Sequence, residues 1–138
     1  MDIKSNELDV VGIGNAIVDV LVKVDDSFLQ SQSFQKGSMC LLDEQQAKKY
    51  YESIAAGCES SGGSAANTLA ALAQLGSKAG FIGRVRDDQL GEIFTKDIRS
   101  AGAQFETKAA NNGPSTARCL IFITPDAQRT MCTYLGAS

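Results

Sequence analysis

The sequence has no histidine and no tryptophan, and only 2 of its 138 residues are proline. Without histidine, the chain cannot build a histidine-ligated zinc site or a Ser–His or Cys–His nucleophile pair. The cysteines show neither metal-ligand spacing nor a Cys-x-x-Cys pattern, and stand at Cys40, Cys58, Cys119 and Cys132. We expect them to be small buried residues in a reducing compartment.

Long apolar runs and basic clusters are also missing. No apolar run approaches the roughly 20 residues that span a bilayer, and the first residues, MDIKSNELD, do not follow the basic-then-apolar pattern of a signal peptide. The net charge of −3 argues against nucleic acid or an anionic membrane as the partner. We therefore expect a cytoplasmic protein that binds neither, in one compact domain.

Strand and helix patterns alternate along the first hundred residues. Residues 8–14 form a short apolar run that suits a buried strand, and the valines of residues 18–24 recur at every second position, which is typical of a strand. After a polar loop, residues 38–42 are again apolar. Residues 59–63 are expected to be a flexible turn, and residues 79–85 a further strand.

Three helices are expected between these strands. Asp43 and Gln46 predict a capping box, with the helix running toward Gly57. A second helix is predicted over residues 64–75, and a third from Asp87 or Asp88 to about residue 102. Each has apolar residues on one helical face.

The pattern changes in the last third of the chain, where three strands are predicted without helices between them. They cover residues 104–108, 116–124 and 129–135, and turn-forming residues join the last two into a hairpin. This order predicts a layered α/β core that carries a small β subdomain. We expect the segments near 17–24, 36–42 and 104–135 to build that subdomain.

Two nucleotide-binding motifs are approached but not matched. Gly12 and Gly14 begin like a dinucleotide fingerprint, but Ile17 occupies the third glycine position and a strand follows where a helix is needed. Lys78 follows Gly76 as in a phosphate-binding loop, but the upstream glycine is missing and a strand follows. The sequence therefore predicts neither a Rossmann site nor a Walker cradle.

A stronger candidate combines a diglycine turn with a carboxylate. Residues 62–67 read GGSAAN, where two glycines let a ligand approach the main chain and Asn67 offers a donor and an acceptor. Asp19 lies in an otherwise apolar strand, either facing solvent or accepting hydrogen bonds from vicinal hydroxyls. If that strand and the following helix are neighbours, Asn15, Asp19, Gly63 and Asn67 would form a polyol site. A third segment, GRVRDDQLG at residues 83–91, is explained by a strand end, a turn and a helix cap.

Together, in this order, these residues resemble the ribokinase-like (PfkB) carbohydrate kinase family. The resemblance runs over about residues 8–137 and rests on VVGIGNAIVDV, GGSAANTLAALAQLG, AGFIGRVRDDQLGEIFTKDIRSAGAQ and TARCLIFITPDAQRTMCTYLGA. It implies a three-layer α/β/α core with a small β-sheet lid, the predicted β subdomain. Residues 1–138 would be the N-terminal portion of a single kinase domain.

The resemblance also implies an activity, the transfer of the γ-phosphate of ATP, with Mg²⁺, to a primary hydroxyl of a sugar or nucleoside. By position, Asp19 matches the carboxylate that holds the sugar hydroxyls, and Gly63 and Asn67 match residues that contact the same sugar. Ser64 stands where the motif varies with substrate. Arg129 resembles a lid arginine near the transferred phosphate, a place where positive charge aids phosphoryl transfer.

The family's catalytic segment, Asp-Thr-x-Gly-Ala-Gly-Asp, does not occur in this sequence. We therefore expect no catalytic residue and no metal ligand here, and no activity from these 138 residues alone. The start GNAIVD favours an adenosine-kinase-like substrate, while ribose, fructose and ketogluconate remain open. A non-catalytic sugar- or nucleoside-binding module is the alternative. Exposed lid edges would allow a homodimer.

Overall fold

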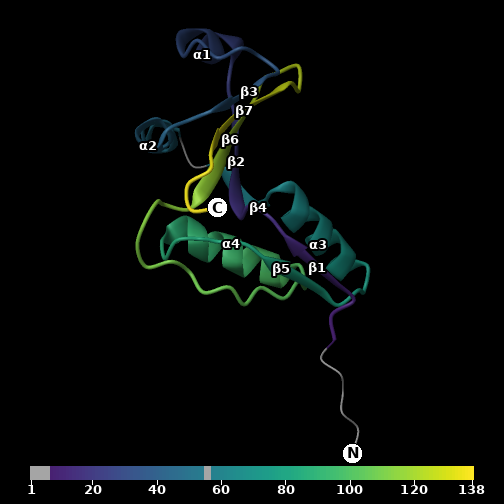
Figure 1. The fold of residues 1–138 in the computed structure, drawn as a ribbon. Helices are drawn as coiled ribbons and strands as arrows, with labels where there is room; N and C mark the ends of the chain where they lie inside the picture. Colours follow the sequence, from purple (N-terminus) through teal and green to yellow (C-terminus); the bar gives the residue numbers. More distant parts are fainter. Residues whose placement is uncertain (1–6, 55–56) are drawn as a thin grey trace, which may run out of the picture.

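A computed structural model describes residues 7–54 and 57–138. The predicted N-terminal segment and the end of the first predicted helix lie partly outside these residues. Figure 1 shows the elements, which are the strands β1 (Val10–Ile13), β2 (Ile17–Lys23), β3 (Met39–Leu41), β4 (Cys58–Gly62), β5 (Ala79–Ile82), β6 (Ala117–Ile123) and β7 (Arg129–Tyr134) and the helices α1 (Asp26–Ser31), α2 (Glu44–Ser53), α3 (Ser64–Gln74) and α4 (Gln89–Ser100).

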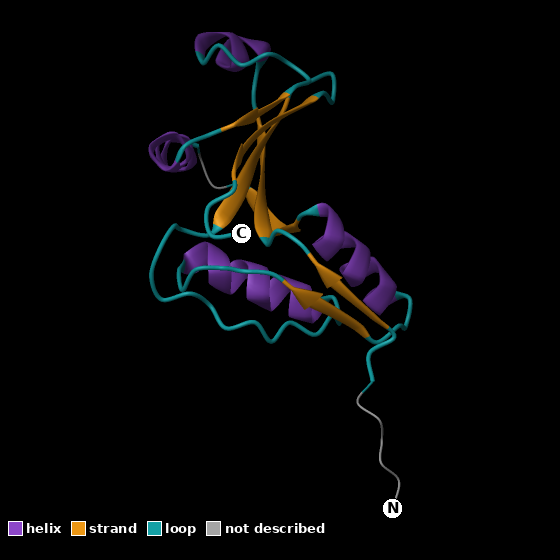
Figure 2. Cartoon of the chain, viewed as in Figure 1, coloured by secondary structure: helices purple, strands orange, loops and turns teal. Residues whose placement is uncertain are grey.

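The strands form two separate sheets. β1 and β5 pair in parallel, and a five-stranded sheet has the order β3-β7-β6-β2-β4. In Figure 2 the five-stranded sheet stands above a layer that contains β1, β5, α3 and α4. β1 leads into β2 through residues 14–16, so this short link connects the two parts of the molecule.

The lower layer is held by aromatic side chains and by close approach of a helix. Phe81 of β5, Phe94 of α4 and Phe105 are buried and pack with ring centroids 5.4–5.8 Å apart. On β1, a Cβ atom at Gly12 would lie 2.4 Å from the Leu69 side chain of α3. Glycine at this position therefore lets α3 lie directly against the strand.

The five-stranded sheet has one face covered by α1, α2 and the segment between them. Phe122 of β6 contacts Phe28 of α1 at 5.1 Å and Phe34 at 5.7 Å, and Phe34 contacts Tyr50 of α2 at 5.2 Å. Because side chains alternate along a strand, the neighbours of Phe122 along β6 face the other way. We call that opposite side, which carries Asp19, the open face.

Several expectations are confirmed. Asp43 and Gln46 form the predicted capping box. The main-chain N–H of Gln46 donates to the Asp43 carboxylate at 2.8 Å, and the main-chain N–H of Asp43 donates to the Gln46 side-chain oxygen at 3.0 Å. β6 and β7 form the predicted antiparallel hairpin. The valine alternation marks β2, in which Val18 and Val20 are buried.

Two predicted loops were wrong. Residues 59–63 were expected to be a turn, yet most of them belong to β4, which pairs antiparallel with β2. Serine and glycine favour turns locally, so pairing with β2 rather than local preference makes this segment a strand. The polar loop after β2 contains α1, whose Leu29 is buried against the sheet.

The predicted strand over residues 104–108 was also wrong. Gln104 makes a single isolated bridge to Gly80, with the Phe81 amide donating to the Gln104 carbonyl at 2.8 Å. This segment lies beside β5 and not in the five-stranded sheet, whose hairpin comprises β6 and β7 alone. Within residues 7–54 and 57–138, no helix combines the length and apolar character needed to cross a bilayer.

Candidate functional site

The site is centred on Asp19, in the middle of β2. The antiparallel register places Asp19 opposite Ser60 and Ile17 opposite Gly62. The β4 strand therefore delivers the diglycine turn to the start of β2, directly beside the Asp19 side chain. Strand and turn are neighbours, as the polyol site requires.

Both glycines of the turn are required by close contacts. A Cβ atom at Gly62 would lie 2.4 Å from the Asp19 carboxyl carbon, and one at Gly63 would lie 2.6 Å from the Asn15 main-chain oxygen. Gly63 also has a φ of 96°, a conformation that L side chains rarely adopt. Side chains at these positions would fill the space around the carboxylate.

Burial disfavours the charged form of Asp19. The side chain is half-buried, and this burial raises the pKa of its carboxyl above the ordinary value. Burial is the one cause of the raised pKa, and among the described residues no hydrogen bond or ion pair to the Asp19 carboxylate opposes it. A half-buried carboxylate with free acceptor sites is suited to bind hydroxyl donors.

The first turn of α3 supplies the remaining predicted residues. Gly63 is the N-cap, and the main-chain N–H of Asn67 donates to the Gly63 carbonyl at 2.9 Å. The side chains of Asn15, Ser64 and Asn67 are exposed at this end of the molecule. The structure thus brings the diglycine turn, the α3 start and the Asn15–Asp19 segment to one place.

A row of side chains continues from Asp19 across the open face. Asp19 is the register partner of Cys119, Cys119 of Thr133, and Thr133 of Leu41. The Thr133 hydroxyl donates to the Cys119 sulfur at 3.2 Å, and both residues are buried. Leu41 is 64% exposed, and its apolar neighbours Met39 and Met131 are 59% and 38% exposed. An apolar surface therefore lies on the same face as the carboxylate, three strands across the sheet from it.

Arg129 lies apart from this cluster. It is exposed and pairs with Ile123 at the tip of the hairpin. Thr133 lies four residues further along β7, or about 13 Å at the rise of a strand. The structure does not bring Arg129 to Asp19.

The segment over residues 83–91 has the structural role expected of it. The Asp88 carboxylate caps α4 by accepting from the Gly91 amide at 2.9 Å. It also accepts from the Thr116 amide at 2.9 Å and the Thr116 hydroxyl at 2.6 Å. Asp88 thereby ties α4 to the residue that precedes β6.

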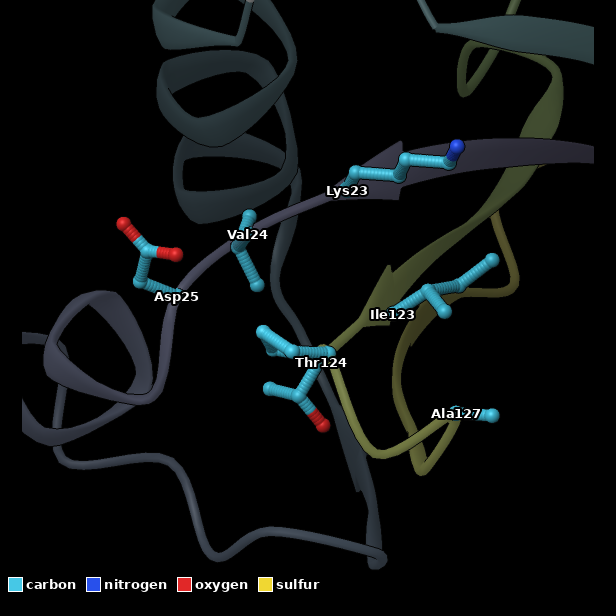
Figure 3. Close-up of a pocket in the computed structure, with 7 residues that line it drawn as sticks. Lys23, Val24, Asp25, Ile123, Thr124 and Ala127 are labelled. Atoms are coloured by element: carbon cyan, nitrogen blue, oxygen red, sulfur yellow. The ribbon is translucent and has the colours of Figure 1, made fainter.

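A cavity of about 430 Å³ lies elsewhere, at the outer ends of β2 and β6 (Figure 3). Its lining includes Lys23, Asp25 and Ile123, and none of the residues predicted from the sequence to bind substrate. In this view the side chains of Lys23 and Asp25 point away from each other. We therefore place the site at Asp19, where the polar groups converge.

Sequence reasoning missed three residues of this site. Gly62, not Gly63, is the glycine against the Asp19 carboxylate. Its signal was the diglycine itself. Cys119 and Thr133 gave no signal, because only the register of β6 and β7 puts them in the row beside Asp19.

The chain is similar to a known protein family and to solved structures. The family model described as pfkB family carbohydrate kinase matches residues 39–138. The chain belongs to this pfkB family. Its α/β fold, expected from the resemblance, is confirmed by the structure of adenosine kinase from Sinorhizobium meliloti, which superposes with a TM-score of 0.84 at 51% identity.

Other pfkB-like proteins are also similar. A probable sugar kinase from Rhizobium etli CFN 42 gives a TM-score of 0.84 at 47% identity over 94% of this chain and 39% of that one. Fructokinase-2 of Solanum lycopersicum is 30% identical over 77 residues, which are 56% of this chain and 24% of that protein. The S. meliloti match covers 94% of this chain, which spans 40% of the length of that relative.

Proposed function

We propose that residues 1–138 form the N-terminal portion of a single kinase domain that transfers the γ-phosphate of ATP to a primary hydroxyl of a sugar or nucleoside. The five-stranded sheet is its lid, and this chain supplies the substrate-binding side. The observation that carries the proposal is Asp19, a half-buried carboxylate with free acceptor sites beside a diglycine turn.

The Asp19 carboxylate accepts hydrogen bonds from two vicinal hydroxyls of the substrate. Hydrogen bonds to a charged acceptor are the strong ones, and a carboxylate has room for two donors. Asn15 and Asn67 stand beside it as further hydrogen-bonding groups, with Ser64 next to them on the first turn of α3. Glycine at positions 62 and 63 leaves the space that the sugar ring fills.

The apolar open face supports a nucleoside over a simple sugar. The side chains of Leu41, Met39 and Met131 are apolar and exposed at the end of the Asp19 row. A nucleobase has apolar faces that such a surface covers, whereas a free sugar presents hydroxyls on both sides. Adenosine is therefore the favoured substrate, and ribose and fructose are the competing ones.

ATP and Mg²⁺ are the expected cosubstrate and metal of this reaction. Within this chain, Arg129 is the cation proposed to lie near the transferred phosphate. It stands about 13 Å along β7 from the Asp19 row, on the same five-stranded sheet as Asp19. The proton-removing base is expected outside this chain.

A second candidate has its own support. The same apolar side chains on the open face are suited to pack against a second copy of the lid, in a binding module or in a dimeric kinase. A Leu41→Ser substitution separates the two uses of this surface. It weakens adenosine binding but not ribose binding if the surface holds a base, and it dissociates a dimer if the surface is an interface.

The activity is tested by initial rates of ATP-dependent phosphorylation of adenosine, ribose and fructose with the full-length protein. The proposal expects the highest kcat/KM for adenosine. Equal rates for adenosine and ribose would remove the role of the apolar surface. No phosphorylation of any of the three, combined with retained adenosine binding, would support the non-catalytic module.

A further inference from the structure

Two cysteines lie side by side on the helix-covered face of the five-stranded sheet. Cys40 of β3 is the register partner of Cys132 of β7, and the Cys40 thiol donates to the Cys132 sulfur at 3.1 Å. Neighbouring strands lie roughly 4.8 Å apart, within the roughly 4.4–6.8 Å between Cα atoms that a disulfide spans. A bond between the sulfurs therefore requires only a small approach of the side chains.

The two thiols differ in access. Cys132 is fully buried, whereas Cys40 is partly exposed and lies on β3, a three-residue strand at the edge of the sheet. A small reagent therefore reaches Cys40 first, and Cys132 is held behind it. This arrangement provides one attacking thiol and one resolving thiol.

The other two cysteines are placed differently. Cys119 points to the open face, where its sulfur accepts from the Thr133 hydroxyl. Cys58 is exposed on β4, at the opposite edge of the sheet from β3. Neither is in register with Cys40 or Cys132, so Cys58 serves as a matched control.

We propose that Cys40 and Cys132 form a reversible disulfide bond with each other. The oxidant is a low-molecular-weight disulfide such as glutathione disulfide. Cys40 gives its proton to solvent, and the Cys40 thiolate attacks one sulfur of the oxidant, breaks its S–S bond and releases one glutathione thiolate, which takes up a proton. Cys132 then gives its proton to solvent, and its sulfur attacks the Cys40 sulfur and expels the second glutathione thiolate, which also takes up a proton. Two protein thiols are oxidised and one glutathione disulfide is reduced to two glutathione thiols.

The second step depends on the loss of the Cys132 proton. Burial raises the pKa of Cys132 and so disfavours its thiolate. Raising the pH therefore accelerates closure of the disulfide.

Closure fixes β3 to β7 covalently. β3 carries Met39 and Leu41 on the open face, so the crosslink holds the apolar surface of that face in one place. This consequence for substrate binding rests on the proposed function, whereas the disulfide itself does not. Amide hydrogen exchange in β3 slows in the oxidised form, because the edge strand opens less often.

The test incubates the native chain with a glutathione redox buffer at alkaline pH and maps disulfides by mass spectrometry without reduction. Wild type and Cys58→Ser are expected to yield one linked Cys40–Cys132 peptide pair, and dithiothreitol to reverse it. Cys40→Ser is expected to yield none. This substitution removes only the partly exposed partner, so folding is not at risk as it is for the buried Cys132.

Retention of both thiols in folded wild type, or a stable glutathione adduct on Cys40 without the linked peptide, would overturn the proposal. The readout involves no substrate. Failure of the disulfide therefore leaves the kinase proposal standing, and a linked peptide in a protein that binds no nucleoside leaves the disulfide standing.

Discussion

At the scale of single residues, Asp19 is held in a place that disfavours its charge. Burial raises the pKa of its carboxyl and so disfavours the ionised form, which is the form that the proposed site uses to accept two hydroxyls. Groups at binding sites often keep such unfavourable environments, because the ligand supplies the missing partners. Asp19 is the described residue where this conflict is clearest.

Asp19→Asn is expected to raise the thermal midpoint of unfolding at pH 7. A raised folded-state pKa means that the protonated carboxyl stabilises the fold below the unfolded-state pKa, and that this stability is lost as pH rises through the folded-state pKa. Asparagine imitates the neutral form, so its advantage should shrink as pH falls toward about 4. Calorimetry at several pH values measures it, with the exposed Asp25→Asn as control. A lower midpoint for Asp19→Asn at pH 7 would contradict this reading.

Gly63→Ala is expected to lower the free energy of unfolding by more than about 2 kcal/mol, because it adds backbone strain and a contact with the Asn15 main-chain oxygen. Gly113→Ala is the matched control. Gly113 also has a positive φ, of 89°, but open space around it, so only the strain of roughly 1–2 kcal/mol applies. Urea unfolding compares the two. Equal losses would show that the close approach at Gly63 does not matter.

At the scale of elements, Asp88 joins the lower layer to the five-stranded sheet. Its carboxylate holds the start of α4 and the buried Thr116 just before β6. Removing it costs a helix cap and leaves buried donors without a partner.

Asp88→Ala is therefore expected to lower the free energy of unfolding by about 2–4 kcal/mol. Asp87→Ala is the control, since Asp87 is exposed and surface changes of this kind usually stay within about 0.5 kcal/mol. Chemical denaturation measures both variants. Similar losses of stability in the two variants would mean that the hydrogen bonds Asp88 accepts from Thr116 do not stabilise the contact between the lower layer and the sheet.

A second link ties α1 to the β6–β7 turn. Lys36 contacts Asp126 at 2.6 Å and Asp26 at 2.7 Å. The hydrogen bond from Lys36, and then that from the Thr124 hydroxyl, lowers the pKa of Asp126 to about 2. Because the folded-state pKa is lowered, the ionised Asp126 stabilises the fold at pH values above the usual aspartate pKa. This contribution is lost as pH falls through about 2.

Carbon-detected NMR titration of the Asp126 carboxyl is expected to give a midpoint near 2 in wild type. Lys36→Met should move the midpoint up toward the usual aspartate value, and the exposed Lys108→Met should leave it unchanged. The effect on stability should be small, because exposed ion pairs contribute little. An unshifted Asp126 in wild type would refute the link.

At the scale of the whole molecule, local patterns predicted the elements better than their pairing. Valine alternation located β2, and the capping box located α2. β4 was missed because its serines and glycine favour a turn, and only pairing with β2 makes it a strand. The contact between Cys40 and Cys132 joins residues 92 positions apart, and no local pattern reports such a register.

The candidate site divides in the same way. Asp19 and the diglycine carried signals in the sequence, because a carboxylate in an apolar strand and two adjacent glycines are unusual locally. The open face of Cys119, Thr133 and Leu41 carried none, since three strands from distant segments build it. Substrate preference, which we propose depends on that face, is therefore the part that sequence reasoning alone resolves least.

The most direct measurement is kcat/KM for adenosine phosphorylation by the full-length protein, compared among wild type, Asp19→Asn and Asp25→Asn. Loss of a charged hydrogen-bond acceptor costs about 1.5–3 kcal/mol, so Asp19→Asn should lower kcat/KM roughly 10- to 100-fold. Asp25→Asn makes the same change in charge away from the site and should match wild type. An Asp19→Asn enzyme within about twofold of wild type would contradict the claim that Asp19 holds the substrate.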